Sequence, residues 1–123
     1  MLFSILLLFL SIMIGLAART NKSIREIFAP RNVTFVIMSK DGKTGRRFIF
    51  RKGKYSSDKM LKDYDMALVF ESTNIGFKTL AFGGPTGLQT AINNYQLKVA
   101  GNAQLYNLFG LLIAVSTGMW KRK

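Results

Sequence analysis

The first eighteen residues, MLFSILLLFLSIMIGLAA, contain no charged side chain, and no other feature limits the fold of this chain as strongly. A helix of that length is about 27 Å long, close to the hydrocarbon thickness of about 30 Å. The run therefore predicts an uncleaved transmembrane anchor over residues 1–18. A cleaved signal peptide is the alternative, but it would need basic residues ahead of the apolar stretch, and the sequence has none there.

All of the positive charge lies outside this apolar run. The net charge is +12, and every Lys and Arg follows Ala18. Because flanking cations favour the cytoplasmic side, the pattern predicts a single-pass membrane protein with its folded part on the cytoplasmic or matrix side. Arg19, Lys22 and Arg25 are then expected at the membrane surface, against anionic headgroups.

A second group of cations lies between Lys40 and Lys62, where nine Lys and Arg residues face only Asp41 and Asp58. This segment favours an anionic lipid surface first and a plain solvated surface second. Nucleic acid is the third choice, because few aromatic side chains are placed to stack on bases. The expected partner of these cations is therefore an anionic membrane surface.

The composition argues against an enzyme. Cysteine and histidine are absent, and the chain has six carboxylates. This removes thiol nucleophiles, the commonest general base and the commonest metal ligand. We therefore expect no catalytic residue, no metal site and no cofactor.

After a basic linker over residues 19–31, the pattern changes to short β-rich runs and helices, which define one domain over residues 32–123. The linker contains a short helix expected from an N-cap at Ser23 to Ile27. The expected strands are Val33–Met38 and Arg47–Arg51, joined as a hairpin, then Met66–Phe70 and Tyr95–Ala100. Helices are expected at about 75–82, 86–92 and 103–118, the last capped by Asn102. This order predicts an α+β layer with a mostly antiparallel sheet.

The last helix is apolar on more than one face. Leu105, Leu108, Phe109, Leu112 and Ile113 follow the spacing of a face turned toward the sheet. Tyr106, Leu111 and Val115 occupy the remaining surface, which a ligand, a partner protein or the bilayer would have to cover. A second membrane span is disfavoured by the charge rule, so an interfacial placement is expected. The residues then at the membrane surface are Trp120, Lys121, Arg122 and Lys123.

In the order and spacing of its elements, the chain resembles the sterol carrier protein 2 (SCP2) family over about residues 33–115. The resemblance rests on DYDMALVFESTNIGFKTLAFGG followed by NNYQLKVAGNAQLYNLFGLL. Asp65 stands before a central strand, and a short helix ends in glycine at Gly83. The strand pattern x-L-x-V-x-G-[DN] is filled by Leu97, Val99, Gly101 and Asn102. The amphipathic helix that usually opens the family's domain is expected to be missing or replaced by the anchor.

This resemblance implies a five-stranded sheet covered by helices, with an apolar tunnel that binds sterols, acyl groups, phospholipids or quinone-like lipids. The predicted function is a membrane-anchored protein that holds or presents such a ligand, and the expected partners are this apolar ligand and a membrane enzyme or complex. The alternative is a non-catalytic accessory subunit of a membrane complex. The predicted cavity lining is apolar and largely aromatic, and consists of Phe35, Ile37, Phe48, Phe50, Phe70, Phe77, Leu80, Phe82, Leu105, Leu108, Phe109 and Leu112.

Overall fold

The structure, a computed structural model, describes residues 2–82 and 87–121, and the side chains of all of these except 82 and 116–121. The helices are α1 (Leu2–Thr20), α2 (Lys22–Phe28), α3 (Thr73–Phe82), α4 (Gly87–Asn93) and α5 (Tyr106–Lys121), with a 3₁₀ turn over Ala103–Leu105. The strands are β1 (Asn32–Ser39), β2 (Gly45–Arg51), β3 (Lys54–Asp58), β4 (Met66–Phe70) and β5 (Leu97–Gly101).

The five strands form one sheet in the order β3-β2-β1-β4-β5. β1 pairs antiparallel with β2 but parallel with β4, and the edge strands β3 and β5 are antiparallel to their neighbours. The sheet is therefore mixed, which corrects the expectation of a mostly antiparallel one. The cause is the connection over residues 59–65, which crosses one face of the sheet and returns the chain to the end from which β1 also starts.

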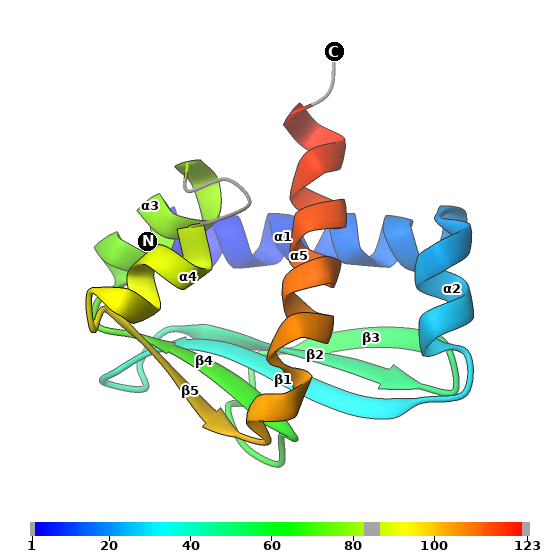
Figure 1. The fold of residues 1–123 in the computed structure, drawn as a ribbon, viewed down its shortest axis with the longest axis horizontal. Coiled ribbons are helices and arrows are strands. Elements are labelled where there is room, and N and C mark those ends of the chain that lie inside the picture. The colour runs from blue at the N-terminus through cyan, green and yellow to red at the C-terminus, as the bar shows by residue number, and fades with distance from the viewer. Residues whose placement is uncertain (1, 83–86, 122–123) are drawn as a thin grey trace.

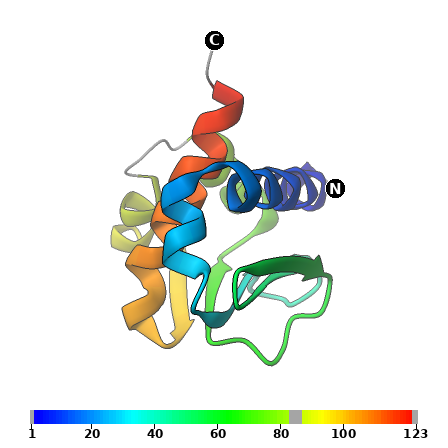
Figure 2. The ribbon, with the colours of Figure 1, turned by 90° about the vertical axis from the view of Figure 1, so that its right-hand side faces the viewer.

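The helices gather on one face of the sheet. α1 lies along this face, α2 packs at its C-terminal end and α3 at its N-terminal end (Figure 1). α5 rises from the end of β5 and crosses α1, and the view from the side shows α1 and α2 above the strands (Figure 2). The connection from β3 to β4 lies on the opposite face, where Leu61 approaches Gly45. The opening apolar run is thus an element packed on the sheet.

The turn between β2 and β3 explains why β3 forms. Lys52 and Gly53 have φ values of 49° and 85°, and Arg51 pairs directly with Lys54. This is a two-residue turn with both central residues at positive φ, the geometry that closes a tight hairpin. β3 was not among the strands expected from the residues alone because Lys54–Asp58 is largely polar, as an edge strand can be.

The helix starts follow side-chain caps. Asn21 accepts a hydrogen bond from the Ile24 amide at 3.0 Å, so α2 begins before the expected cap at Ser23. The predicted cap at Asn102 is confirmed, since its side chain accepts from the Gln104 amide at 3.0 Å. The strand expected at Met66–Phe70 is confirmed with the same bounds.

Candidate functional site

The face of the sheet beneath the helices is apolar and closed to water. Alternation along the strands turns Phe35 and Ile37 of β1 toward this face, next to Phe48 and Phe50 of β2 and Phe70 of β4. All five side chains have 0% exposure and belong to one core cluster. Eight of the twelve predicted lining residues therefore meet in the core, because Leu80 of α3 and Phe109 and Leu112 of α5 are also buried there.

Aromatic stacking joins α5 to the sheet. The rings of Phe35 and Phe109 are parallel, with centroids 4.2 Å apart, and Phe48 lies 5.9 Å from Phe109. A second stack, with centroids 4.1 Å apart, joins Phe28 of α2 to Phe50. Offset and tilted rings at these distances each add roughly 0.5–1.5 kcal/mol beyond the burial of their area.

The other predicted lining residues lie around this cluster. Phe77, Leu105 and Leu108 are partly buried and pack against the core. Phe82 lies outside the described side chains, as do Trp120 and Lys121 of the predicted membrane surface. Arg122 and Lys123 lie outside the described residues.

α1 covers the apolar face of the sheet with a stripe of large side chains, which we call the inner stripe. It consists of Phe3, Leu6, Leu7, Leu10, Met13, Ile14 and Ala17, each 9% exposed or less. Phe3 meets the edge of Phe70, with ring centroids 6.0 Å apart. Burial of one large apolar side chain is worth about 1.5–3 kcal/mol, so the stripe binds α1 to the sheet by a gross free energy on the order of 10 kcal/mol.

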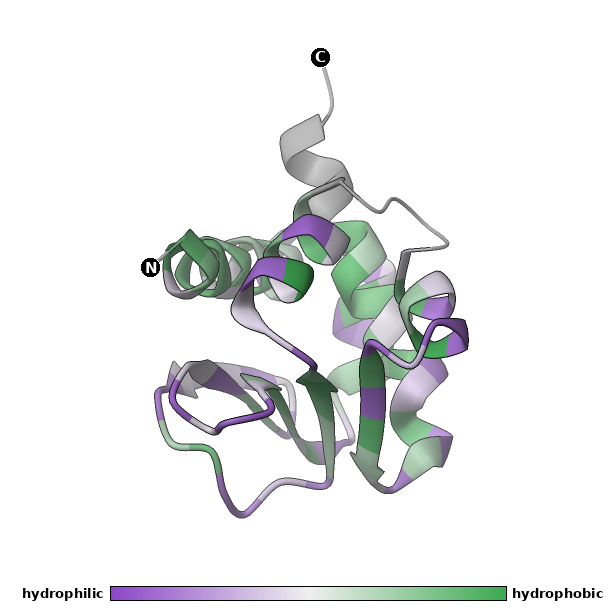
Figure 3. Cartoon of the chain, turned by 90° about the vertical axis from the view of Figure 1, so that its left-hand side faces the viewer, coloured by the Kyte–Doolittle hydropathy of each residue, from purple (hydrophilic) through white to green (hydrophobic). Residues whose placement is uncertain are grey.

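The opposite face of α1 is also apolar, and it is exposed (Figure 3). This outer stripe consists of Leu2, Ile5, Leu8, Phe9, Ile12 and Leu16, which are 41–62% exposed. By length and composition alone, α1 could cross a membrane. However, 44% of its most apolar 18-residue stretch is buried inside the protein. Scattered exposed apolar residues are ordinary, but a continuous row of this kind marks an interaction surface.

A polar contact fixes α1 against the β2–β3 hairpin. The hydroxyl groups of Ser11 and Tyr55 form a hydrogen bond of 2.7 Å. The Tyr55 ring also packs against α1 at Gly15, where a Cβ would lie 3.5 Å from it. Burial raises the pKa of Tyr55 above its ordinary value, so the phenol stays neutral. The apolar composition of residues 1–18 does not indicate this contact. The sequence feature that could have indicated it is Ser11, a polar residue among apolar ones.

A hollow of about 530 Å³ opens beside this contact. It is lined by Ile12, Gly15, Leu16, Ala18 and Arg19 of α1 and by Gly53, Lys54 and Tyr55 of the hairpin. A second hollow, of about 570 Å³, lies at the β5 edge and includes Phe70, Leu97, Val99, Lys40 and Glu71. Of the twelve predicted lining residues, Phe70 alone lines either of these two hollows.

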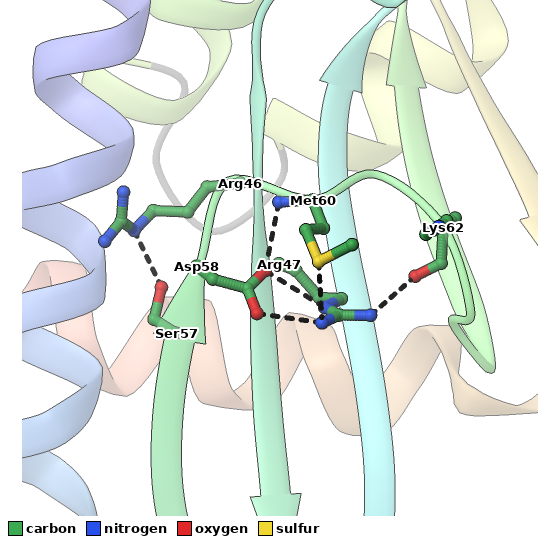
Figure 4. A network of polar contacts seen from close by, with 6 residues as sticks. All are labelled: Arg46, Arg47, Ser57, Asp58, Met60 and Lys62. Carbon is green, nitrogen blue, oxygen red and sulfur yellow. Dashed lines mark hydrogen bonds and ion pairs between the residues drawn. The ribbon is translucent and has the colours of Figure 1, made fainter.

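Two cations of the basic segment are engaged within the sheet. The Arg47 guanidinium binds both carboxylate oxygens of Asp58, at 3.1 and 2.8 Å, and also donates to the Lys62 carbonyl oxygen (Figure 4). The hydrogen bond from Arg47 holds the pKa of Asp58 below its usual range. Arg46 donates to the Ser57 hydroxyl at 2.7 Å. These arginines therefore brace β2 against β3 and the loop that follows it.

The predicted membrane-surface cations near α1 are exposed. Arg19, Lys22 and Arg25 all face solvent at the C-terminal end of α1 and on α2. The β2–β3 turn lies at the same end, because Gly53 packs against Ala29 and the Lys52 amide donates to the Arg31 carbonyl oxygen. Among the described residues, no group of three or more His, Cys, Asp or Glu side chains is placed to hold a metal ion.

Comparison with known proteins shows a likeness of fold. No protein-family model matches the sequence, and no curated protein does. The fold is similar to a solved structure described as "UbiJ-SCP2 Ubiquinone synthesis protein", with a TM-score of 0.53 and 16% sequence identity. The match covers 82% of this chain and 96% of that one. The chain therefore has an SCP2-like fold, as the resemblance in its sequence predicts.

Proposed function

We propose, from this SCP2-like fold, that the protein is a non-catalytic module that binds an apolar, quinone-like or acyl lipid and holds or presents it at a membrane. α1 keeps the domain at the bilayer. The solved neighbour of this fold is described as a ubiquinone synthesis protein, which supports a lipid of the quinone type as the ligand.

The observation that carries this proposal is the hollow between α1 and the β2–β3 hairpin. Its volume of about 530 Å³ is within the range of small-molecule sites, about 300–1,000 Å³. Ile12 and Leu16 line it and also belong to the exposed outer stripe. An apolar chain can therefore pass from the bilayer into the hollow without crossing water.

Beyond the hollow, the ligand would extend between α1 and the aromatic face of the sheet. Each CH₂ of such a chain would cost about 0.8 kcal/mol if it were exposed to water, so a path from the bilayer that stays apolar avoids this cost. The inner stripe is already packed against the sheet, so the ligand would have to replace part of that packing.

The first test is to purify the full chain in mild detergent, extract it with organic solvent and identify bound lipids by mass spectrometry. A fluorescent acyl lipid then measures binding directly. We expect an apolar lipid to co-purify, and we expect Ala18→Phe, which fills the hollow, to reduce binding at least tenfold. Gln96→Phe adds comparable bulk at the second hollow and should bind as the original chain does. No co-purifying lipid, together with no binding of the fluorescent lipid, would overturn the proposal.

A second function, that of an accessory subunit in a membrane complex, is favoured by the filled core. The stacks of Phe35 on Phe109 and of Phe28 on Phe50 leave the centre of the predicted cavity occupied by protein. Leu111 of α5 is 44% exposed and offers an apolar contact for a partner. Gel filtration in mild detergent separates the two functions, because a lone monomer supports the carrier and an obligate larger assembly supports the subunit.

A further inference from the structure

The hollow between α1 and the β2–β3 hairpin combines two kinds of lining. Its apolar wall is formed by Ile12 and Leu16, and its rim by Arg19 and Lys54. No carboxylate is among the residues that line it. A phospholipid has the same two-part chemistry, since its phosphate is anionic and its acyl chains are apolar.

The two rim cations are available for an anion. The ion pairs that the described residues form are Lys40 with Glu71 and Arg47 with Asp58, so neither Arg19 nor Lys54 takes part in one. Both side chains are exposed. An Arg guanidinium and a Lys ammonium are the side chains that bind phosphate oxygens most strongly.

The surroundings of the hollow are mostly cationic, although α2 also carries one exposed carboxylate, Glu26. Lys22 and Arg25 on α2 are exposed at this end of the molecule, as are Arg51 and Lys52 at the hairpin turn. Because each cation near an anionic leaflet strengthens attraction to it, this end of the protein favours a membrane that contains anionic lipid.

The packing of α1 determines how it meets this membrane. A helix that crossed the bilayer would have to leave the sheet, which would expose the inner stripe and break the Ser11–Tyr55 hydrogen bond. A helix that lies in the membrane plane keeps both and buries the outer stripe among the acyl chains. The exposed face of α1 consists of Leu, Ile and Phe side chains, as a helix in the membrane plane requires on the side that contacts acyl chains.

We infer that α1 lies in the plane of the membrane and that the rim of the hollow beside it holds the phosphate of an anionic phospholipid between Arg19 and Lys54. This inference rests on the proposed membrane location and deepens it by naming the lipid class that the surface recognises. The acyl chains of that lipid lie along Ile12 and Leu16, on the outer stripe.

Vesicle flotation of the full chain tests this inference. The vesicles are pure phosphatidylcholine or phosphatidylcholine mixed with phosphatidylglycerol. The test variant is Arg19→Gln with Lys54→Gln. The matched control is Lys59→Gln with Lys62→Gln, on the loop across the opposite face of the sheet. Each pair removes two cations and lowers the net charge from +12 to +10.

The original chain should bind the anionic vesicles more strongly than the neutral ones. Loss of one surface cation weakens such binding about fivefold, so the test variant should bind anionic vesicles about 25-fold more weakly. The control should change less than about threefold. Equal binding to both vesicle types, or equal losses in the two variants, would overturn the inference.

Two further measurements distinguish this inference from a site for free phosphate and from the proposed carrier function. Inorganic phosphate added at constant ionic strength should leave vesicle binding unchanged, and displacement by it would assign the hollow to free phosphate instead. Failure of flotation with intact binding of the fluorescent lipid overturns this inference alone. Intact flotation with no fluorescent-lipid binding overturns the proposed carrier function alone.

Discussion

At the scale of single residues, Gly101 and Asp65 hold the point where β5 ends beside the start of β4. The Asp65 carboxylate accepts a hydrogen bond of 2.7 Å from the Thr34 amide, and its carbonyl oxygen accepts one of 2.8 Å from the Asn102 amide. Gly101 has a φ of 80°, and a Cβ there would lie 2.5 Å from the Asp65 carbonyl oxygen. Only glycine fits both requirements.

Gly101→Ala should therefore destabilise the protein by about 3 kcal/mol, through left-handed strain and the contact with Asp65. Gly42→Ala is the matched control, since Gly42 has a φ of 73° but nothing lies within 4 Å of its Cβ position. The control should cost only the strain, about 1–2 kcal/mol. Denaturant unfolding in mild detergent measures both, and equal losses would show that the approach to Asp65 is unimportant.

The Asp58 carboxylate links stability to pH. Its pKa is lowered chiefly by the hydrogen bond from Arg47, so its contribution to stability is complete above the pKa of the unfolded state, about 3.9. That contribution is lost as the pH falls through the lower pKa of the folded state. We expect Asp58→Asn to make the melting temperature fall less steeply as the pH is lowered. Part of the acid dependence should remain, because the hydrogen bond from Ser39 also lowers the pKa of Asp41. An unchanged acid limb in the variant would contradict this role.

At the scale of elements, local pattern was sufficient for some parts of the fold. The runs of apolar residues predicted β4 at Met66–Phe70, and alternation predicted the shared face of Phe35 and Ile37, because successive strand residues point to opposite faces. The polar edge strand β3 carries no such signal. The parallel pairing of β1 with β4 depends on the path of the loop between β3 and β4, which local pattern does not describe.

The candidate site was predicted only in part, because it also depends on contacts between residues far apart in the sequence. The strand residues and Phe109 do meet, but α1, which covers them, is apolar on both faces, so its sequence does not say which face packs on protein. Ser11 and Tyr55 are 44 positions apart, and their contact depends on how α1 is placed across the sheet. The hollow beside them follows from this long-range packing.

The contact of α5 with the sheet can be tested by a pair of substitutions on one helix. Phe109→Ala removes a side chain with 0% exposure from the stack with Phe35 and should cost about 3–5 kcal/mol. Leu111→Ala, on the exposed side of the same helix, should change the stability by less than about 0.5 kcal/mol in detergent. Thermal unfolding followed by circular dichroism measures both, and similar losses would contradict the assigned faces of α5.

At the scale of the whole molecule, α1 covers the aromatic face of the sheet together with α2 and α5. The inner stripe of α1 completes the core, and its outer stripe faces outward beside a group of cations at one end. The opposite face of the sheet carries the loop over residues 59–65 and the braced pair Arg47 and Asp58. The protein is thus two-sided, with one side suited to a bilayer and the other to water.

The central claim, that α1 lies between the sheet and the membrane, can be measured by spin labels. Because the chain has no cysteine, Ile5→Cys, Leu8→Cys, Ile12→Cys and Leu16→Cys each give one labelled site on the outer stripe. Electron paramagnetic resonance with oxygen and a polar relaxation agent then gives the depth of each label in vesicles that contain anionic lipid. We predict the same shallow depth at all four sites. A change of depth along the helix, approaching the roughly 17 Å rise between positions 5 and 16, would show that α1 crosses the bilayer and would contradict this claim.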